Sequence, residues 1–389
     1  MSRFEKFSLR FLSIVAVLLA GAFFWLYQTK WSKPLGPVLQ IPHTPIPTAF
    51  GLPPTWTPNP HDDTPLSTLV PASVSTTLST PGPIKKTIGV CGAASPMFIL
   101  AVGSDQRADS YLYGLADVIR LIRVDFVNPK VTVLEIPRDL WVEIPDIADN
   151  LKGQDHEKLN QAYLYGNPGM GYTKDPAGGP GLLARTLTLN FGTEIDHYAA
   201  VNMRTFEKIV NAVDGIDVTL PETVDGRTAE DKASRLLFLQ GTHHLNGAQA
   251  LTLARIRIEG VFSRADNQDR VLCALRDKLT SPEVVTKIPD LIQSFQGAIQ
   301  TSLSPQEISQ LACLGTQLDP QNIIFTSFPQ QLFEQGRTYD PLFKKYIFTW
   351  DVDYDILREY IQQFNSGKWP SAVAAQTEPQ QKGETVICQ

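Results

Sequence analysis

The sequence predicts an α/β domain over residues 87–365, in which helices cover both faces of a mixed sheet. Short apolar runs rich in β-branched residues alternate there with segments of helical spacing, a pattern typical of α/β domains. Val118–Val124 and Val131–Ile136 are two such runs, and the turn residues Asn128 and Pro129 lie between them. Runs joined by so short a turn pair antiparallel, so a purely parallel sheet is not expected.

The remaining elements follow from the same spacing. Further strands are expected at Met97–Val102, His197–Val201, Ile216–Leu220 and Asn322–Phe328, and Trp141–Ile144 is a candidate to extend the sheet. Helices are expected at Gly181–Asn190, Arg204–Val213, Asn246–Ala254, Gln268–Leu279, Pro282–Gln300, Pro305–Gln317 and Tyr354–Phe364. The polar residues 366–389 are expected to form a flexible tail.

Composition narrows the class of protein. The 389 residues exceed one average domain but do not require two folded domains. A net charge of −6 and a pI near 5.6 argue against a nucleic-acid-binding protein, which presents a basic face. Any anion site must therefore be a local cluster of arginines.

Four cysteines, an even number, suit two disulfides in an oxidising compartment: Cys91, Cys273, Cys313 and Cys388. No C-x-x-C pair and no cysteine–histidine cluster with zinc spacing is present, so a structural zinc site is not expected. Cys273 and Cys313 lie in helical segments and the other two bracket the folded region, which favours Cys273–Cys313 and Cys91–Cys388 among the three possible connectivities. Four unpaired thiols are the alternative.

Residues 11–27 are predicted to span a membrane. They carry no charge and no proline, and their number fits the roughly 17–25 residues that a spanning helix needs. Arg3, Lys6 and Arg10 precede them, so residues 1–10 are expected in the cytoplasm and everything after Tyr27 outside the cell membrane. A signal peptide cleaved at residues 20–22 is the alternative, and the apolar run that continues beyond them favours the anchor.

Residues 28–86 are rich in proline, threonine and serine. Such a composition does not form a packed core and is typical of an extended stalk. The stalk is expected to hold the folded domain away from the membrane.

Polar residues follow the predicted strands at several points, and strand ends of α/β folds are where ligands bind. They are Asp105 and Arg107 after the first strand, Asp117 at the start of the second, Arg138 and Asp139 after the third, Lys158 and Asn160 further on, and Arg255, Arg257, Arg264 and Gln268 around the later helices. Taken singly, Asp105 has the alternative role of a turn residue, and Arg138 with Asp139 that of a surface ion pair. Their joint occurrence in one domain favours an anion site.

The order of these motifs resembles the LytR–CpsA–Psr family of cell-wall glycopolymer ligases. The resemblance covers Met97 to Leu279 and includes LAVGSDQR, ADVIRLIRVD, VTVLEIPRDLWVEIP, KLNQAYLYG, GGPGLLARTL, FEKIVNAVDGIDVTLP, FLQGTHHLNGAQALTLARIR and SRADNQDRVL. It implies a three-layer α/β/α sandwich with an apolar lipid-binding tunnel, whose mouth arginines line.

The resemblance also implies roles for individual residues. Asp105 and Asp117 match two aspartates associated with Mg²⁺ and catalysis, and Arg138 is expected at the same catalytic site. The pyrophosphate is expected to bind Arg107, Arg138, Lys158, Arg255, Arg257, Arg264 and Gln268. Carboxylates with phosphate oxygens suit Mg²⁺, and arginines bind phosphate bidentately.

The chain departs from the family pattern near both clusters. Leu115 and Ala116 stand where an arginine and a serine are usual, and Asn267 stands where an arginine is common. These replacements remove cations from the expected clamp, so they are the sequence features that favour a weakened or non-catalytic version.

The implied function is transfer of a glycopolymer phosphate from a polyprenyl-pyrophosphate carrier onto a peptidoglycan acceptor at the cell membrane. A polyprenyl-pyrophosphate hydrolase and a non-catalytic lipid-binding or regulatory module are the alternatives. A Ser-His-Asp hydrolase is not expected, because no G-x-S-x-G motif occurs.

Overall fold

The computed structural model describes residues 31–41, 86–256, 261–285, 297–370 and 385–387, with residues 15, 21, 291 and 295. Its central sheet has seven strands among these residues. In spatial order they are β13 (Gln300–Thr301), β8 (His197–Asn202), β3 (Met97–Ser104), β4 (Ala116–Asp125), β5 (Lys130–Glu135), β14 (Ile323–Ser327) and β17 (Thr385–Ile387).

The sheet is mixed, as the short turn between the second and third predicted strands indicated. β4 pairs antiparallel with both β3 and β5, whereas β3 pairs parallel with β8 and β5 pairs parallel with β14. β3, β5, β8 and β14 therefore share one direction and end at the same edge of the sheet. β4 begins at that edge because it runs the other way.

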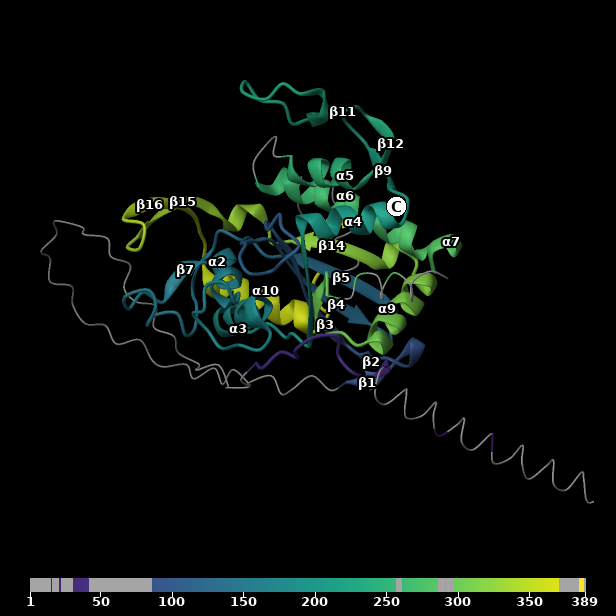
Figure 1. The fold of residues 1–389 in the computed structure, drawn as a ribbon, viewed down its shortest axis with the longest axis horizontal. Coiled ribbons are helices and arrows are strands. Elements are labelled where there is room, and N and C mark those ends of the chain that lie inside the picture. Colours follow the sequence, from purple (N-terminus) through teal and green to yellow (C-terminus); the bar gives the residue numbers. More distant parts are fainter. Residues whose placement is uncertain are drawn as a thin grey trace, which may run out of the picture. The chain divides into compact units, whose positions relative to one another are not determined.

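Helices pack on both faces of this sheet (Figure 1). Figure 1 shows α2 (Leu159–Gly166), α3 (Gly178–Phe191) and α10 (Tyr354–Asn365) to the left of the strands. Above and to the right lie α4 (Met203–Ala212), α5 (Gly247–Arg255), α6 (Val261–Thr280), α7 (Pro282–Val285) and α9 (Pro305–Gln317). β3 is accordingly apolar along its whole first half, as a strand covered on both faces must be.

The core divides between the sheet and the helices that flank it. Met97 and Ile99 of β3 pack with Phe325 of β14 and Leu314 of α9 in one apolar cluster. A second cluster joins α4, α5 and α6 to β9 (Ile216–Leu220) and β12 (Gly241–Leu245), which pair with each other outside the central sheet. Burial of such side chains stabilises a fold by roughly 1.5–3 kcal/mol each, so both clusters hold the helices firmly against the strands.

The other ladders each have two strands. They are β1 (Thr87–Ile88) with β2 (Ala94–Ser95), β6 (Trp141–Glu143) with β7 (His156–Lys158), β10 (Val224–Asp225) with β11 (Leu237–Phe238), and β15 (Glu334–Asp340) with β16 (Lys345–Asp351). Single 3-10 turns lie at η2 (Val90–Gly92), η3 (Ser234–Leu236), η4 (Pro320–Asn322) and η5 (Gln330–Leu332). Trp141–Glu143 thus does not extend the central sheet, because β7 satisfies its backbone.

Two further expectations differ from the structure. The helix predicted over Pro282–Gln300 extends too far, because Gln300 belongs to β13. α7 covers Pro282–Val285 at the start of that range, and residues 286–290 lie outside the described set. Within the predicted flexible tail, Thr385–Ile387 form β17, which pairs antiparallel with β14. A short β-branched segment can add to the free edge of a sheet from any distance in sequence, which local patterns do not reveal.

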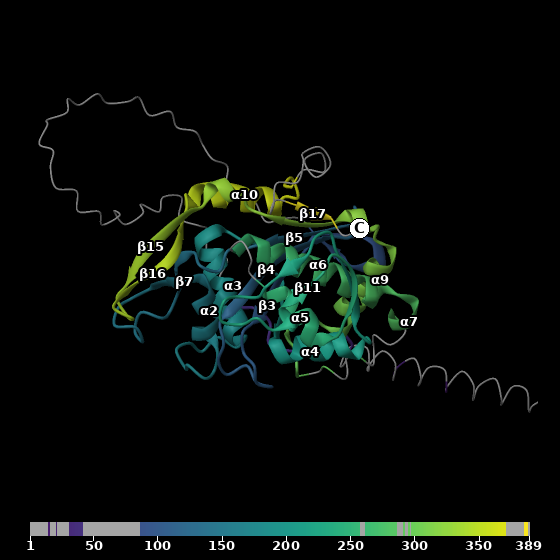
Figure 2. The ribbon, with the colours of Figure 1, turned by 90° about the horizontal axis from the view of Figure 1, so that it is seen from above.

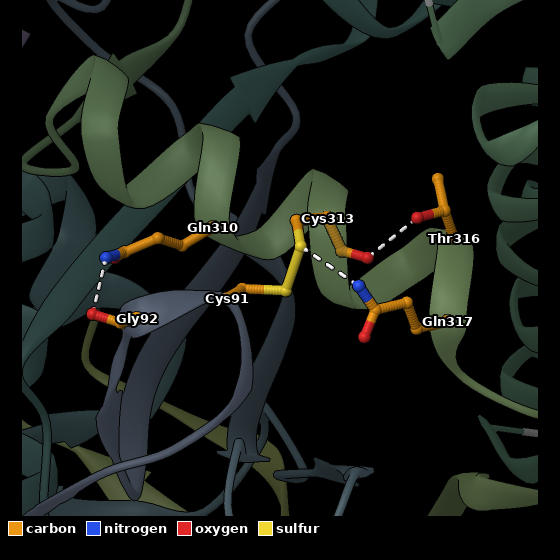
Figure 3. The surroundings of a disulfide bond; sticks show 6 residues. All are labelled: Cys91, Gly92, Gln310, Cys313, Thr316 and Gln317. Carbon is orange, nitrogen blue, oxygen red and sulfur yellow. Dashed lines mark hydrogen bonds between the residues drawn. A yellow bond between two sulfur atoms is a disulfide. The ribbon is translucent and has the colours of Figure 1, made fainter.

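Disulfide pairing also differs from the prediction. Cys91 of η2 bonds Cys313 of α9, with their Cα atoms 6.0 Å apart (Figure 3). The same two elements are joined by a hydrogen bond of 3.0 Å from Gln310 Nε2 to the Gly92 carbonyl. Cys273 is disulfide-bonded as well, and Cys388 lies outside the described residues. The expected Cys273–Cys313 and Cys91–Cys388 pairs were wrong because the packing of α9 on η2, and not shared helical character, decides which sulfurs meet.

The membrane-spanning prediction concerns residues that are mostly outside the described set. Among the described residues, no helix combines the length and the apolar character that crossing a bilayer requires. Part of the predicted stalk is described and contacts the folded domain: the Leu35 amide donates a hydrogen bond of 3.0 Å to the Leu303 carbonyl. Residues near Leu35 therefore lie on the domain surface rather than extending from it.

Candidate functional site

Three of the expected site residues converge at one edge of the central sheet. Asp105 directly follows β3, Asp117 is the second residue of β4, and Arg138 follows the end of β5. The ends of β3 and β5 meet the start of β4 at this edge because β4 is antiparallel to both. The sheet topology thus brings together three residues that the sequence analysis placed at strand ends.

A β-bulge directs Asp117. Gly103 pairs with Val118 and Ser104 pairs with Ala116, so Asp117 is the extra residue on β4. Bulges of this kind turn one side chain out of the regular alternation and are common beside active sites. Asp117 lines the apolar cavity described below, and its carboxylate forms an ion pair with Arg138 Nη1.

Asp105 closes the loop between β3 and β4. Its amide donates to the Leu115 carbonyl at 3.1 Å, and its Oδ1 accepts from the Leu115 amide at 2.7 Å. Gly114 in this loop has a φ of +115°, and a Cβ there would come within 2.5 Å of Ser104 Oγ, so the loop requires glycine. Asp105 therefore has the role of a turn residue, which was the alternative interpretation of this position. The two hydrogen bonds to Leu115 hold its carboxylate at the sheet edge.

Arg138 belongs to a network of charges. Its Nε lies 3.3 Å from Asp139 Oδ2, and Lys158 Nζ lies 2.8 Å from Asp139 Oδ1. The Arg138 and Lys158 side chains are only 21% and 18% exposed. The interactions are consequently less screened than a surface ion pair, and Asp139 orients two cations toward the same edge.

The cations around α5 and α6 are only partly described. Arg255 is exposed in the last turn of α5 and lines the cavity. Gln268 is buried in α6, and its Nε2 donates to the Ala254 carbonyl at 3.3 Å. Arg257 and the side chain of Arg264 lie outside the described residues. Arg107 is exposed in the loop after β3, and Asn160 is buried in α2.

Arg120 was missed by the sequence analysis. It is 2% exposed on β4, where its Nη1 forms an ion pair with Asp269 of α6 and its Nη2 donates to Gln268 Oε1 at 3.3 Å. Burial raises the pKa of the Asp269 carboxyl, and the Arg120 charge opposes that shift. The sequence contained a signal for this buried ion pair, because Arg120 lies within an apolar strand. An arginine at a core-facing position of such a strand requires a buried partner.

The two departures from the family pattern also have defined places. Leu115 contributes its backbone to the Asp105 loop, and Asn267 is buried at 3% exposure, where its Oδ1 accepts from Arg270 Nη1 at 3.3 Å. Neither supplies a cation at the sheet edge. Three described cations of the expected pyrophosphate site lie at this edge. Arg138 and Lys158 contact Asp139, and Arg255 lines the cavity.

An apolar cavity of about 280 Å³ opens beneath this edge, between the sheet and α4, α5 and α6. Its wall includes Ala101, Val201, Phe206, Leu251 and Val271, and its rim includes Asp117 and Arg255. A second cavity of about 760 Å³ shares Ala199 with the first and continues along α6 and α9. Charged groups thus stand at one end of an apolar space, which suits an amphiphilic ligand.

The fold and this site define an α/β protein whose sheet edge, lined by cations and carboxylates, lies above an apolar cavity. Residues 74–351 match the LytR_cpsA_psr family. The chain therefore belongs to that family, and the family membership predicted from the motifs is confirmed.

Curated relatives include the polyisoprenyl-teichoic acid–peptidoglycan teichoic acid transferase TagV of Bacillus subtilis strain 168, which is 30% identical over 211 residues, 54% of this chain and 50% of TagV. The regulatory protein MsrR of Staphylococcus aureus strain COL is 29% identical over 216 residues, 54% of this chain and 58% of MsrR. This chain thus spans about half of the length of TagV and somewhat more than half of that of MsrR. The crystal structure of B. subtilis TagV superposes with a TM-score of 0.52 at 25% identity, over 70% of this chain and 97% of that one.

Proposed function

We propose that this chain is a membrane-anchored phosphotransferase that moves a glycopolymer phosphate from a polyprenyl-pyrophosphate carrier onto peptidoglycan. One observation carries the proposal: cations and carboxylates gather at the sheet edge where an apolar cavity opens. A polyprenyl pyrophosphate has the same division between an anionic head and an apolar tail. Homology to TagV, a transferase by name, supports the same reaction class.

The two cavities are the proposed lipid tunnel between the sheet and one helical layer of a three-layer sandwich. Most of their lining consists of apolar side chains from the sheet and from α4, α5, α6 and α9. Burying each methylene of a lipid chain contributes about 0.8 kcal/mol, so this lining can hold a long isoprenoid tail. The charged rim then fixes the depth at which the pyrophosphate stops.

The proposed clamp consists of Arg138, Arg255, Lys158 and Arg107, with Gln268, Arg257 and Arg264 completing it. Guanidinium groups bind phosphate oxygens bidentately and keep their charge. In the described structure Asp139 already holds Arg138 and Lys158 in place. A pre-oriented clamp loses little side-chain entropy when the donor binds.

Asp105 and Asp117 fit a Mg²⁺ ion only together with ligand oxygens. No group of three or more acidic, histidine or cysteine side chains within the described ranges could hold a metal alone. Two carboxylates with phosphate oxygens are nevertheless the donor set that Mg²⁺ takes in phosphoryl-transfer sites. When bound, the ion would neutralise charge that develops on the phosphate oxygens.

In the proposed reaction an acceptor hydroxyl attacks the phosphorus that carries the glycan. The bond from that phosphorus to the bridging oxygen breaks, and polyprenyl monophosphate leaves with the electron pair. Asp105 or Asp117 takes the proton of the hydroxyl, while the clamp stabilises charge on the transferred group. The products are a phosphodiester-linked glycan and the free lipid phosphate.

We further propose that the folded domain lies outside the cell membrane, anchored by residues 11–27 with residues 1–10 in the cytoplasm. The Cys91–Cys313 disulfide supports this placement, because disulfides persist in oxidising compartments. Accessibility of the folded domain to an added protease in intact cells would test it. Cleavage of the folded domain only after cell lysis would contradict it.

The decisive experiment supplies the full chain, in detergent with Mg²⁺, with a labelled polyprenyl-pyrophosphoryl oligosaccharide, in the presence and absence of peptidoglycan. Label that moves to peptidoglycan only when acceptor is present, with release of polyprenyl phosphate, is the expected result. Release without acceptor would show a hydrolase instead. Tight donor retention without turnover would show a binding or regulatory module, and Leu115 and Asn267 would then be the residues to replace by arginine.

A further inference from the structure

The β15–β16 hairpin carries four aromatic side chains on one face. Directly paired residues in the hairpin are Gln335 with Trp350, Arg337 with Phe348, and Tyr339 with Tyr346. Because partners opposite each other share a face and every second residue returns to it, these six side chains lie on one side of the ribbon. We call its rings, Trp350, Phe348, Tyr346 and Tyr339, the aromatic stripe.

The stripe begins at the proposed clamp. The Trp350 amide donates to the Asp139 carbonyl at 3.3 Å, and Lys158 Nζ lies 5.6 Å from the centre of the Phe348 ring. Asp139 and Lys158 are the residues that form the charge network with Arg138. A ligand lying along the stripe would therefore be led to the clamp.

Exposure increases along the stripe away from the clamp. Trp350 is 8% exposed, whereas Tyr339 and Tyr346 at the far end are 47% and 66% exposed. The rings pack in two pairs, with centroids 5.0 Å apart for Phe348 and Trp350 and 5.4 Å apart for Tyr339 and Tyr346. Figures 1 and 2 show the hairpin extending beyond β7 and α2, away from the central strands. The outer rings are thus open to a large partner.

The charges near the outer rings are positive. Arg337 is exposed on the same face as the stripe, and Lys344 is exposed in the turn. Lys345 is also exposed but pairs with Asp340 on the opposite face, where its Nζ lies 5.4 Å from the Phe343 ring centre. Asp340 is the acidic residue between Arg337 and Tyr346, and it is fully buried, where its Oδ1 accepts from the Leu342 and Phe343 amides. This patch is therefore cationic on a chain of net charge −6.

We propose that the aromatic stripe binds the acceptor, a glycan strand that carries carboxylates, and guides its hydroxyl to the clamp. The C–H faces of sugar rings stack on aromatic rings, whose faces carry negative charge, and Arg337 with Lys344 matches the carboxylates of the wall polymer. This inference depends on the proposed function, since it names the acceptor surface of that same site. Continuity with Asp139 and Lys158 favours a glycan over a lipid surface, because a lipid headgroup would need only the outer tip.

The test measures sedimentation of the full chain in detergent with purified insoluble peptidoglycan. The double variant Tyr339→Ala, Tyr346→Ala is expected to weaken peptidoglycan binding by about tenfold or more, since two aromatic contacts are lost. Tyr339→Phe, Tyr346→Phe keeps the rings and should bind within about twofold of the parent. The matched control is Leu239→Ala, an apolar side chain of similar exposure, 59%, away from the hairpin, and it should change nothing.

Two further measurements separate the possible failures. Binding of the labelled polyprenyl-pyrophosphoryl oligosaccharide should be unchanged in the alanine double variant; if the parent chain itself fails to bind this donor, the proposed function fails independently of the stripe. Vesicles of phosphatidylglycerol test the lipid surface. Unaltered peptidoglycan binding in the alanine double variant, or loss of vesicle binding with peptidoglycan binding kept, would overturn the stripe as a glycan site.

Discussion

Arg138 and Asp117 form an ion pair across the edge of the central sheet, although 21 residues separate them in the chain. Their side chains are 21% and 18% exposed, so the pair is partly shielded from solvent. Asp139 contacts the same guanidinium. A phosphate that enters the site therefore meets a cation already fixed by two carboxylates.

Arg138→Ala is expected to raise the donor dissociation constant by about 10- to 100-fold, since a charge-assisted contact to the phosphate is lost and the Asp117 carboxylate loses its guanidinium partner. Arg257→Ala is expected to act in the same direction. Titration of each variant with the labelled donor checks this. Arg204→Ala removes an exposed arginine paired with Asp109 and serves as the control; unchanged donor affinity in both Arg138→Ala and Arg257→Ala would refute the clamp.

Asp117→Asn and Asp105→Asn are expected to lower turnover by roughly 10²–10⁴-fold while donor binding persists, because each removes a carboxylate base or metal ligand but keeps a hydrogen-bonding side chain. In Asp105→Asn the side-chain amide oxygen can still accept from the Leu115 amide, as the carboxylate does in the parent, so the loop should keep its shape. Single-turnover label transfer at several Mg²⁺ concentrations is the measurement. Full activity in both variants would exclude these residues from the chemistry.

Arg120→Met is expected to destabilise the domain by about 3–5 kcal/mol, because it leaves Asp269 buried without its cation. Adding Asp269→Leu should restore most of that stability, since the uncompensated charge is then gone. The free energy of unfolding in urea, measured for the parent, both single variants and the double variant, gives the double-mutant cycle. Arg227→Met, which breaks an exposed pair with Asp225, should not change the unfolding midpoint; an equally small effect of Arg120→Met would contradict the buried pair.

Glu157 should make stability depend on pH. It is fully buried, and burial, with the nearby Asp340 charge, raises its pKa from 4.5 to about 7. Between these two values the folded state holds a proton that the unfolded chain releases, so stability should fall as pH rises from about 4.5 to 7 and then level off.

Glu157→Gln removes this titration. It should therefore stabilise the domain at pH 8 relative to the parent by up to about 3 kcal/mol and have little effect at pH 4.5. Thermal or urea unfolding across this pH range is the measurement, with Glu143→Gln at the half-buried neighbouring strand as the control. A parent and a Glu157→Gln variant with parallel pH profiles would contradict the shifted pKa.

Local sequence patterns were sufficient for the central strands and for most helices. The apolar run of β3 and the β-branched runs of β4 and β5 have lengths and flanking turns that allow few alternatives. Pro305–Gln317 was predicted with the bounds of α9. In the structure Ser304 and Glu307 form a capping box there and Pro305 starts the helix, which fixes its beginning. The β15–β16 hairpin was missed because its residues are largely polar or exposed.

The sequence by itself determined the family and placed Asp105, Asp117 and Arg138 at the ends or starts of predicted strands. It also indicated a mixed sheet, because strands joined by a short turn pair antiparallel. Tertiary structure alone decided which distant groups touch. It paired Cys91 with Cys313, buried Arg120 against Asp269, and laid the hairpin of Trp350 beside Asp139. Those contacts depend on how helices and hairpins pack against the sheet. The spacing of residues along the chain does not determine that packing.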